Sequence, residues 1–451
     1  MALGITWILD GLEVTLAGAV SGALKESPAL RLTDAKVGLS ATGYLAGAVL
    51  GALLFGWLAD LYGRKRLFFV TLGVYIAGTA MSAVSPDFTI FVLSRFITGA
   101  GIGGEYAAIN SAIQELIPAR YRGRTDLAIN GSFWVGAAFG AVGSSMLLAP
   151  GTLPPDMGWR AAFGIGAVLG VGILFLRGFL PESPRWLLLH GRKEEAEAIV
   201  AAVERQAGLP SPRPSPKGEG VLRLRIRTRS TNFIDLGRSL FHLYPRRATL
   251  GLVLMASQAF CYNAIFFTYA LVLGRFYSIP SDRVGLYLLP FAVGNFLGPL
   301  LLGRYFDTVG RRVMISATYG VAGLLLGLTA ILFVAGHLDA VTQTVAWTIV
   351  FFFASAAASS AYLTVGECFP LEVRALSIAF FYALGTGIGG VMAPWLFGVL
   401  VGTGEASAVA WGYALGAVLM LAAAGVALWL GVDAECKPLE TVAPPLSKVD
   451  R

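Results

Sequence analysis

Four ionisable side chains interrupt long apolar stretches of this sequence: Asp10, Glu13, Arg95 and Glu105. An ionised group in the middle of a bilayer costs several kcal/mol unless it is paired or hydrated, so such residues indicate function. Asp10 and Glu13 stand three residues apart and share one helix face, whereas Glu105, ten residues after Arg95, falls on the opposite face or flank. Carboxylates beside a guanidinium can form a static ion pair or exchange protons, and we expect one of these chemistries here.

The elements that hold these residues must be membrane helices. Of the 451 residues, 56% are hydrophobic and only 14% are charged, which is more apolar chain than a soluble core buries. It falls in spans of about 20 residues. The alternating polarity of a membrane barrel is absent, so helices remain as the way to satisfy the backbone in lipid. We therefore expect an all-α polytopic membrane protein embedded in a lipid bilayer.

The apolar spans form two groups of six. We place them near residues 2–24, 37–59, 67–84, 88–114, 126–149, 160–179, 249–275, 284–302, 313–335, 341–366, 376–401 and 408–430. This pattern predicts an N-terminal bundle over 1–179 and a C-terminal bundle over 248–430. A cytoplasmic linker over 180–247 joins the bundles, and a cytoplasmic tail over 431–451 follows them.

The linker contains two kinds of segment. Its first part predicts a short amphipathic helix that ends near Gln206. The following stretch, PSPRPSPKGE at 210–219, is too low in complexity to pack against anything. We expect this second part to be a flexible connection.

Positive charge sets the orientation of the chain. Six segments on one side of the membrane carry 27 of the 34 Lys and Arg residues, whereas the segments on the other side carry six. The six segments rich in Lys and Arg are 60–66, 115–126, 177–247, 303–312, 367–375 and 431–451. Because such residues remain on the inside, both termini are expected in the cytoplasm of a cell inner membrane. The same crowding explains the net charge of +7 without nucleic acid.

The first span begins abruptly. Only nine residues precede Asp10, and at about 1.5 Å per residue the helix barely reaches the inner interface of the membrane. It therefore stays open whether a short N-terminal segment is missing from this sequence. The acids Asp10 and Glu13 interrupt any signal-peptide core, so we expect no cleavable leader.

Cysteines and histidines are too scattered for a disulfide framework or a metal cluster. They are Cys261, Cys368, Cys436, His190, His242 and His337. We expect neither a metal site nor redox chemistry. The sequence shows no nucleotide-binding loop and no nucleophile paired with a general base. We therefore do not expect an enzyme.

One loop pattern occurs twice, as GWLADLYGRKR at 56–66 and as GRYFDTVGRR at 303–312. Each copy has a glycine for close packing, an acid, and a second glycine that permits a turn before paired cations. Two copies at matching places in similar halves resemble the signature loop of the major facilitator superfamily of transporters. The resemblance implies twelve helices in two pseudo-symmetric six-helix bundles, with a substrate site between them near the middle of the membrane.

Further motifs resemble the sugar-porter branch of that superfamily and its organic-ion relatives. The most specific is PESPRWL at 181–187. The strings RFITGAGIG at 95–103, ELIPARYRG at 115–123 and ECFPLEVRA at 367–375 support it, while the closing motif at 435–440 is a worn version of the family pattern.

Five acids at the cytoplasmic helix ends have arginines nearby in sequence. In this family such groups pair across the bundles when the inside is closed and separate when it opens, so we interpret them as a gate. Each exposed pair contributes about 0–1 kcal/mol, which biases the equilibrium without fixing it. The pairs are Asp60 with Arg64, Glu115 with Arg122, Glu182 with Arg185, Asp307 with Arg311, and Glu367 with Arg374.

The resemblance also implies a role for the charges within the spans. In proton-coupled relatives, an acid at the position of Asp10 pairs with an arginine at the position of Arg95, and protonation of the acid frees the arginine. We expect Asp10 and Arg95 to act in this way, with the proton as coupling ion and no other cofactor. Glu13 and Glu105 stay open as a second proton site, a substrate contact or a partner for Arg95.

The expected substrate pocket departs from the sugar pattern. Sugar porters usually carry two adjacent glutamines in the seventh helix, and one of them is lost here. Fewer amides and several aromatic rings favour a flat, mostly apolar metabolite with one polar end, such as an aromatic or small organic acid. The candidate contact residues are Asn130, Trp134, Gln258, Asn263, Phe267 and Tyr362.

We therefore expect a monomeric secondary transporter that carries a small-molecule substrate together with protons by alternating access. Two alternatives within transport stay open, a facilitator that uses no ion and a sugar porter. A transporter-like membrane receptor is a third, although the tail of 21 residues after the last span is short for a signalling module.

Overall fold

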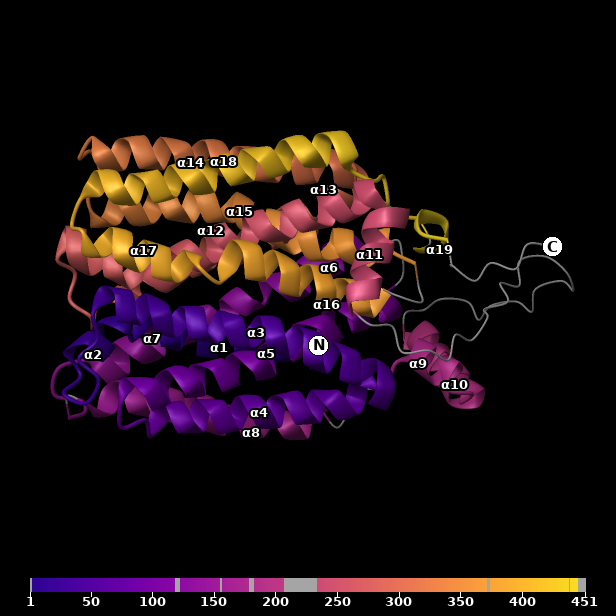
Figure 1. The fold of residues 1–451 in the computed structure, drawn as a ribbon, viewed down its shortest axis with the longest axis horizontal. Helices are drawn as coiled ribbons and strands as arrows, with labels where there is room; N and C mark the ends of the chain where they lie inside the picture. Colours follow the sequence, from indigo (N-terminus) through magenta and orange to yellow (C-terminus); the bar gives the residue numbers. More distant parts are fainter. Residues whose placement is uncertain are drawn as a thin grey trace, which may run out of the picture.

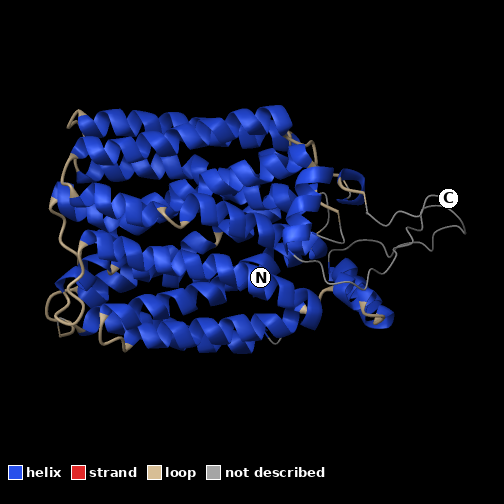
Figure 2. Cartoon of the chain, in the orientation of Figure 1, coloured by secondary structure: helices blue, strands red, loops and turns tan. Residues whose placement is uncertain are grey.

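The computed structural model describes most of the chain. The described residues are 2–117, 122–154, 156–177, 182–206, 233–370, 374–437 and 439–444. Their secondary structure is helical throughout, with short loops at the two ends of the molecule, and no strand occurs in these ranges (Figure 2). The low-complexity stretch 210–219 and the last residues of the tail lie outside the described part.

The N-terminal half is built from eight helical segments. They are α1 (Ala2–Ala19), α2 (Ser21–Glu26), α3 (Asp34–Tyr62), α4 (Arg64–Ala83), α5 (Phe88–Leu116), α6 (Arg122–Gly131), α7 (Phe133–Leu148) and α8 (Met157–Arg177). The C-terminal half contains α12 (Pro245–Tyr277), α13 (Val284–Thr308), α14 (Arg311–Val334), α15 (Ala340–Cys368), α16 (Arg374–Gly385), η3 (Thr386–Gly390), α17 (Ala393–Gly402) and α18 (Ala406–Leu430).

The two halves lie side by side with their long helices roughly aligned (Figure 1). Ten helical segments of the described chain are long and apolar enough to cross a membrane. The helices α1 and α5, which carry the four ionisable residues of the spans, run among them and complete six long segments in each half. The expected all-helical membrane architecture is confirmed.

Linker and tail helices mark one end of the molecule. The helices α9 (Pro184–Leu189) and α10 (Lys193–Gln206) project there together with α19 (Leu439–Val442), and α2 lies at the opposite end (Figure 1). We call these the linker end and the outer end. The helix that we expected to finish near Gln206 is α10, whereas α11 (Phe233–Leu243) was not anticipated.

Glycines let the helices of each half approach closely. A Cβ atom on Gly11 of α1 would lie 1.8 Å from the carbonyl oxygen of Phe133 at the start of α7, which no side chain could tolerate. Such backbone contact fixes α1, and therefore its acids, at a defined depth against α7.

Two long segments are broken at mid-length. The predicted fifth span divides into α6 and α7 around Ser132, and the eleventh divides into α16, the π-helical turn η3 and α17. In the second case Gly385 and Gly389 pack against the backbone of α12, where a Cβ would meet atoms of Met255 and Ala256. Breaks of this kind often occur at functional sites, and these two border the central cavity described below.

The two halves touch each other at both ends. At the outer end, a Cβ atom on Gly398 of α17 would lie 2.8 Å from the carbonyl oxygen of Asp34 at the start of α3. At the linker end, the backbone N–H of Arg124 donates to Oδ2 of Asp307 at 2.9 Å. The central cavity therefore lies between two layers of contact.

Candidate functional site

A cavity of about 150 Å³ lies between the two halves. All six residues that the sequence pattern proposed as substrate contacts line it, from helices α6, α7, α12 and α15. They are Asn130, Trp134, Gln258, Asn263, Phe267 and Tyr362. No Asp, Glu, Lys or Arg among the described residues belongs to the lining.

Aromatic rings that the sequence analysis missed complete one wall of the cavity. The rings of Trp7 and Tyr106 lie 4.5 Å apart, and Tyr106 meets Tyr382 edge to face at 5.4 Å. Tyr382 in turn lies 6.2 Å from Tyr362. The wall thus joins α1 and α5 of one half to α15 and α16 of the other. Such a surface presents large apolar ring faces with hydroxyl and indole N–H groups at their edges.

Two amides of the cavity are anchored by their own helices. The Asn130 amide donates to the carbonyl of Asp126 at 2.9 Å and to its carboxylate at 3.3 Å. The Asn263 amide donates to the carbonyl of Ala259 at 2.7 Å. Asp126 is fully buried and was not singled out from the sequence, where it stands close to the cytoplasmic loop motif and looks like a loop charge.

Arg95 forms a buried ion pair with Glu13. Its Nη1 lies 2.6 Å from Oε1 of Glu13, and the two side chains are 3% and 1% exposed. The guanidinium also stacks over the rings of Tyr44 and Phe163, at 4.8 and 5.2 Å from their centroids. A charge so enclosed is stabilised by its carboxylate partner and by cation–π contacts.

In the structure the partner of Arg95 is Glu13 and not Asp10, which the sequence analysis expected. Asp10 lies one turn earlier on α1, is 4% exposed and makes contacts of its own. Glu105 is also buried, but ten residues of helix carry it about 15 Å from Arg95 along α5, so it is not the partner either.

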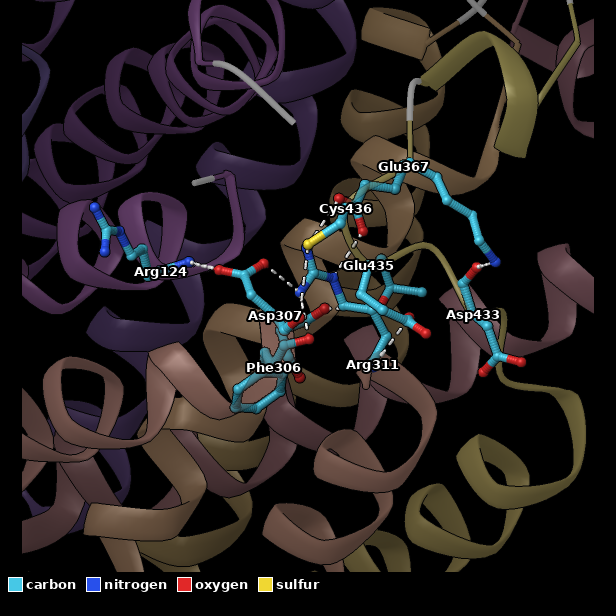
Figure 3. A network of polar contacts seen from close by, with 11 residues as sticks. Arg124, Phe306, Asp307, Arg311, Glu367, Asp433, Glu435 and Cys436 are labelled. Atoms are coloured by element: carbon cyan, nitrogen blue, oxygen red, sulfur yellow. Dashed lines mark hydrogen bonds and ion pairs between the residues drawn. The ribbon is translucent and has the colours of Figure 1, made fainter. Parts of the chain in front are cut away.

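A second polar cluster closes the linker end (Figure 3). Arg311 binds Asp307 at 2.9 Å and Glu367 at 3.0 Å, and all three side chains are nearly inaccessible to solvent. Asp307 also accepts the backbone N–H of Arg124 from the other half. Glu435 of the tail accepts the backbone N–H of Arg311 at 3.4 Å. A carboxylate that bridges the two bundles is what a gate at this end requires.

Other members of the proposed gate behave differently. Glu182 accepts the backbone N–H groups of Arg64 and Lys65 at 2.9 and 3.3 Å, so it caps the start of α4 within one half. Arg374 is buried at 2% exposure. The side chains of four further members lie outside the described part, namely Asp60, Glu115, Arg122 and Arg185.

The histidines, cysteines and acids of the described residues do not gather into one cluster. That part of the chain contains no group of three or more His, Cys, Asp or Glu side chains that could hold an ion. The cysteines are free thiols, two of them buried.

Comparison with known proteins places the chain among transporters. A family model described as sugar (and other) transporter matches residues 15–444. A niacin transporter of Acinetobacter baylyi is 27% identical over 443 residues, which cover 98% of this chain and 94% of the relative. A myo-inositol transporter of Schizosaccharomyces pombe is 30% identical and covers 84% of this chain and 70% of the relative.

The fold has close counterparts among solved structures. A proton:xylose symporter of the major facilitator superfamily, bound to 6-bromo-6-deoxy-D-glucose, superimposes with a TM-score of 0.75 over 98% of both chains. The sequence identity is only 18%, so this likeness concerns the fold alone.

Proposed function

This chain belongs to the sugar (and other) transporter family and is a secondary transporter of the major facilitator superfamily; we propose that it moves a small organic metabolite together with protons. The family members and the fold are those of transporters and not of enzymes. Transport proceeds by rocking of the two bundles around the central cavity, which opens to one side at a time.

The observation that carries proton coupling is the ion pair between Arg95 and Glu13. Two opposite charges buried at 2.6 Å stabilise each other, and either one alone would be costly in a low-dielectric core. Protonation of Glu13 removes one charge and releases Arg95, which changes the packing of α1 against α5. A proton taken up on one side can thus drive a conformational change, and Asp10 and Glu105 are secondary acids in this scheme.

The cavity supports an aromatic or other small organic acid over a sugar. A volume of about 150 Å³ is close to that of an apolar cavity that holds one benzene ring. Half of its lining residues are aromatic, and its polar groups are amides and hydroxyls, which meets the needs of a flat ring with one polar end. The niacin transporter among the relatives fits this class, because niacin is a ring with one carboxyl group. The absence of a cation from the described lining favours binding of the acid together with its proton.

The experiment that tests this function is uptake into proteoliposomes with and without an imposed pH gradient. Candidate substrates come from a thermal-shift screen of aromatic acids, other organic acids, sugars and organic cations. Accumulation of an acid that depends on the pH gradient supports symport. Counterflow that ignores the gradient would favour the facilitator, a hexose or inositol as the only ligand would favour the sugar porter, and binding without transport would favour the receptor.

We further propose that the linker end faces the cytoplasm of a cell inner membrane, with both termini inside and the protein acting as a monomer. The excess of Lys and Arg in the segments of the linker end supports this orientation. A cysteine placed at Gly404 should react with an impermeant reagent from outside, and one placed at Lys193 only from inside. The opposite labelling pattern would reverse the orientation.

A further inference from the structure

A second, smaller cavity lies between Arg95 and the outer end. Its volume of about 20 Å³ matches a single water molecule. Ser21 of α2, Ser40 of α3 and Arg95 of α5 supply its polar walls, and apolar side chains supply the rest. Since α2 lies at the end opposite the linker helices, this cavity separates the buried ion pair from the outer face (Figure 1).

Polar atoms at this cavity lack hydrogen bonds. Oγ of Ser21 and Nη2 of Arg95 are buried and have no hydrogen-bond partner among the described residues. Glu13 does not line the cavity and meets it through Arg95, but its Oε2, the carboxylate oxygen that Arg95 does not bind, is likewise buried with no hydrogen-bond partner among the described residues. Ser40 donates its hydroxyl to the carbonyl of Val37 and so can still accept. Buried polar groups normally have partners, so this group of atoms calls for one.

We propose that this cavity binds one water molecule, which hydrogen-bonds Ser21 and Arg95 and carries protons from the outer face to Glu13. The water accepts a proton from the outer side as it gives one to Oε2 of Glu13, so it ends unchanged and Glu13 becomes neutral. The relay rests on the proposed proton coupling. The water site itself rests on the cavity and on its unpaired polar atoms.

Phe267 separates this water site from the substrate cavity. Its ring lines both cavities, and it lies 6.0 Å from the ring of Tyr44, which covers the other side of Arg95. The proposed water site and the substrate cavity are therefore separate spaces with one shared wall. A substrate that presses on Phe267 also acts on the wall of the water site, which gives the two ligands a physical connection.

The surroundings of Glu13 contain few other proton carriers. Arg95, Tyr44 of α3 and Tyr75 of α4 face it from the neighbouring helices, and Asp10 acts from its own helix. The helix α7 has no titratable residue, and α8 presents Gly166 to Glu13 at this level. On α6, which runs parallel to α1, the one titratable side chain beyond the first turn is Asp126, toward the linker end. Ser21 and Arg95 are thus the polar side chains on the outer side of Glu13 that the proposed water can join.

Two measurements test the proposal. A map of the wild-type protein at a resolution that shows ordered water should contain density between Ser21 and Arg95. In proteoliposomes, Ser21→Val removes the hydroxyl and fills the cavity, so uptake driven by a pH gradient should slow roughly tenfold while substrate exchange stays within about twofold. Retained exchange shows that the variant is folded. Ser21→Ala should give a smaller loss in the same direction.

The matched control is Ser144→Ala, which removes a buried hydroxyl of α7 that is bonded to its own helix. It should leave both activities unchanged. A map without density at this place overturns the water site, and wild-type pH-driven uptake in Ser21→Val overturns the relay. If uptake by the wild-type protein does not respond to a pH gradient at all, the proposed proton coupling and the relay are both refuted. The water site is still tested separately by the density map.

Discussion

The guanidinium of Arg95 and the carboxylate of Glu13 meet at 2.6 Å in a part of the membrane domain that solvent scarcely reaches. Neither group can stay ionised there alone without a large cost in free energy. In the proposed mechanism the pair links two events, because Arg95 moves away easily only when Glu13 has bound a proton. The first prediction separates this acid from its neighbour on the same helix.

Asp10→Asn should still concentrate substrate when a pH gradient is imposed. Asp10 lies one turn from the ion pair and is not the partner of Arg95, so we expect a loss of rate of about two- to tenfold with accumulation retained. Initial rates and final accumulation in proteoliposomes give the two quantities separately. Loss of accumulation with exchange intact would return the proton site to Asp10.

Trp134→Ala should weaken substrate binding about tenfold or more. The ring lines the cavity and packs against Tyr262 and Phe291, so its loss removes ring contacts and opens space around the ligand. Isothermal titration with a ligand from the screen measures the change in Kd. Trp429→Ala is the matched control, since that ring is 79% exposed at the membrane-facing surface. Equal effects of the two changes would remove Trp134 from the site.

Asp307→Asn should slow transport several-fold and leave Kd for the substrate within about threefold. The change weakens both the ion pair with Arg311 and the bridge to Arg124 in the other half, which shifts the balance between the two states without touching the cavity. Rates of exchange and ligand titration report the two effects. Asp433→Asn, on an exposed residue of the same end, should behave like wild type. Normal transport by Asp307→Asn would refute the gating role.

Asp156→Ala should lower the thermal stability at neutral pH and have a smaller effect in acid. Burial alone would raise the pKa of Asp156, but hydrogen bonds from Ser27, Trp159 and Arg160 outweigh it and hold this pKa below its ordinary value. A lowered pKa in the folded state stabilises the protein above the unfolded pKa of about 3.9, and this stabilisation disappears as the pH falls through the folded value.

Tm should therefore differ most between wild type and Asp156→Ala near pH 7, and the difference should shrink below about pH 4. Asp282→Ala serves as the control, because Asp282 lies in an outer loop of the other half and forms no ion pair with a described residue. A Tm difference that is the same at both pH values would exclude an electrostatic origin.

Length and polarity were sufficient to predict most of the fold. The spans agree with the helices to within a few residues, as at the seventh span, which was expected from 249 and begins at Pro245. The breaks at Ser132 and at Thr386–Gly390 were not predicted, because they depend on where glycines meet the backbone of another helix. Apolar periodicity carries no information about that contact.

The amides of the site were predicted because polar residues interrupt an apolar helix, whereas only some of its rings were predicted. Gln258 and Asn263 stand out in an apolar span, whereas Tyr106 and Tyr382 look alike whether they face lipid or a cavity. The partner of Arg95 could not be predicted from the sequence either. Asp10 and Glu13 share a helix face, and only the depth at which α1 packs against its neighbours decides which of them meets the guanidinium.

The most direct test of the account is Glu13→Gln in proteoliposomes. Glutamine keeps the shape of the side chain and imitates the protonated acid, so Arg95 is free of its partner at any pH. We predict that this variant exchanges substrate across the membrane but no longer concentrates it when a pH gradient is imposed. Accumulation equal to wild type in Glu13→Gln would contradict the proposal that this ion pair couples protons to transport.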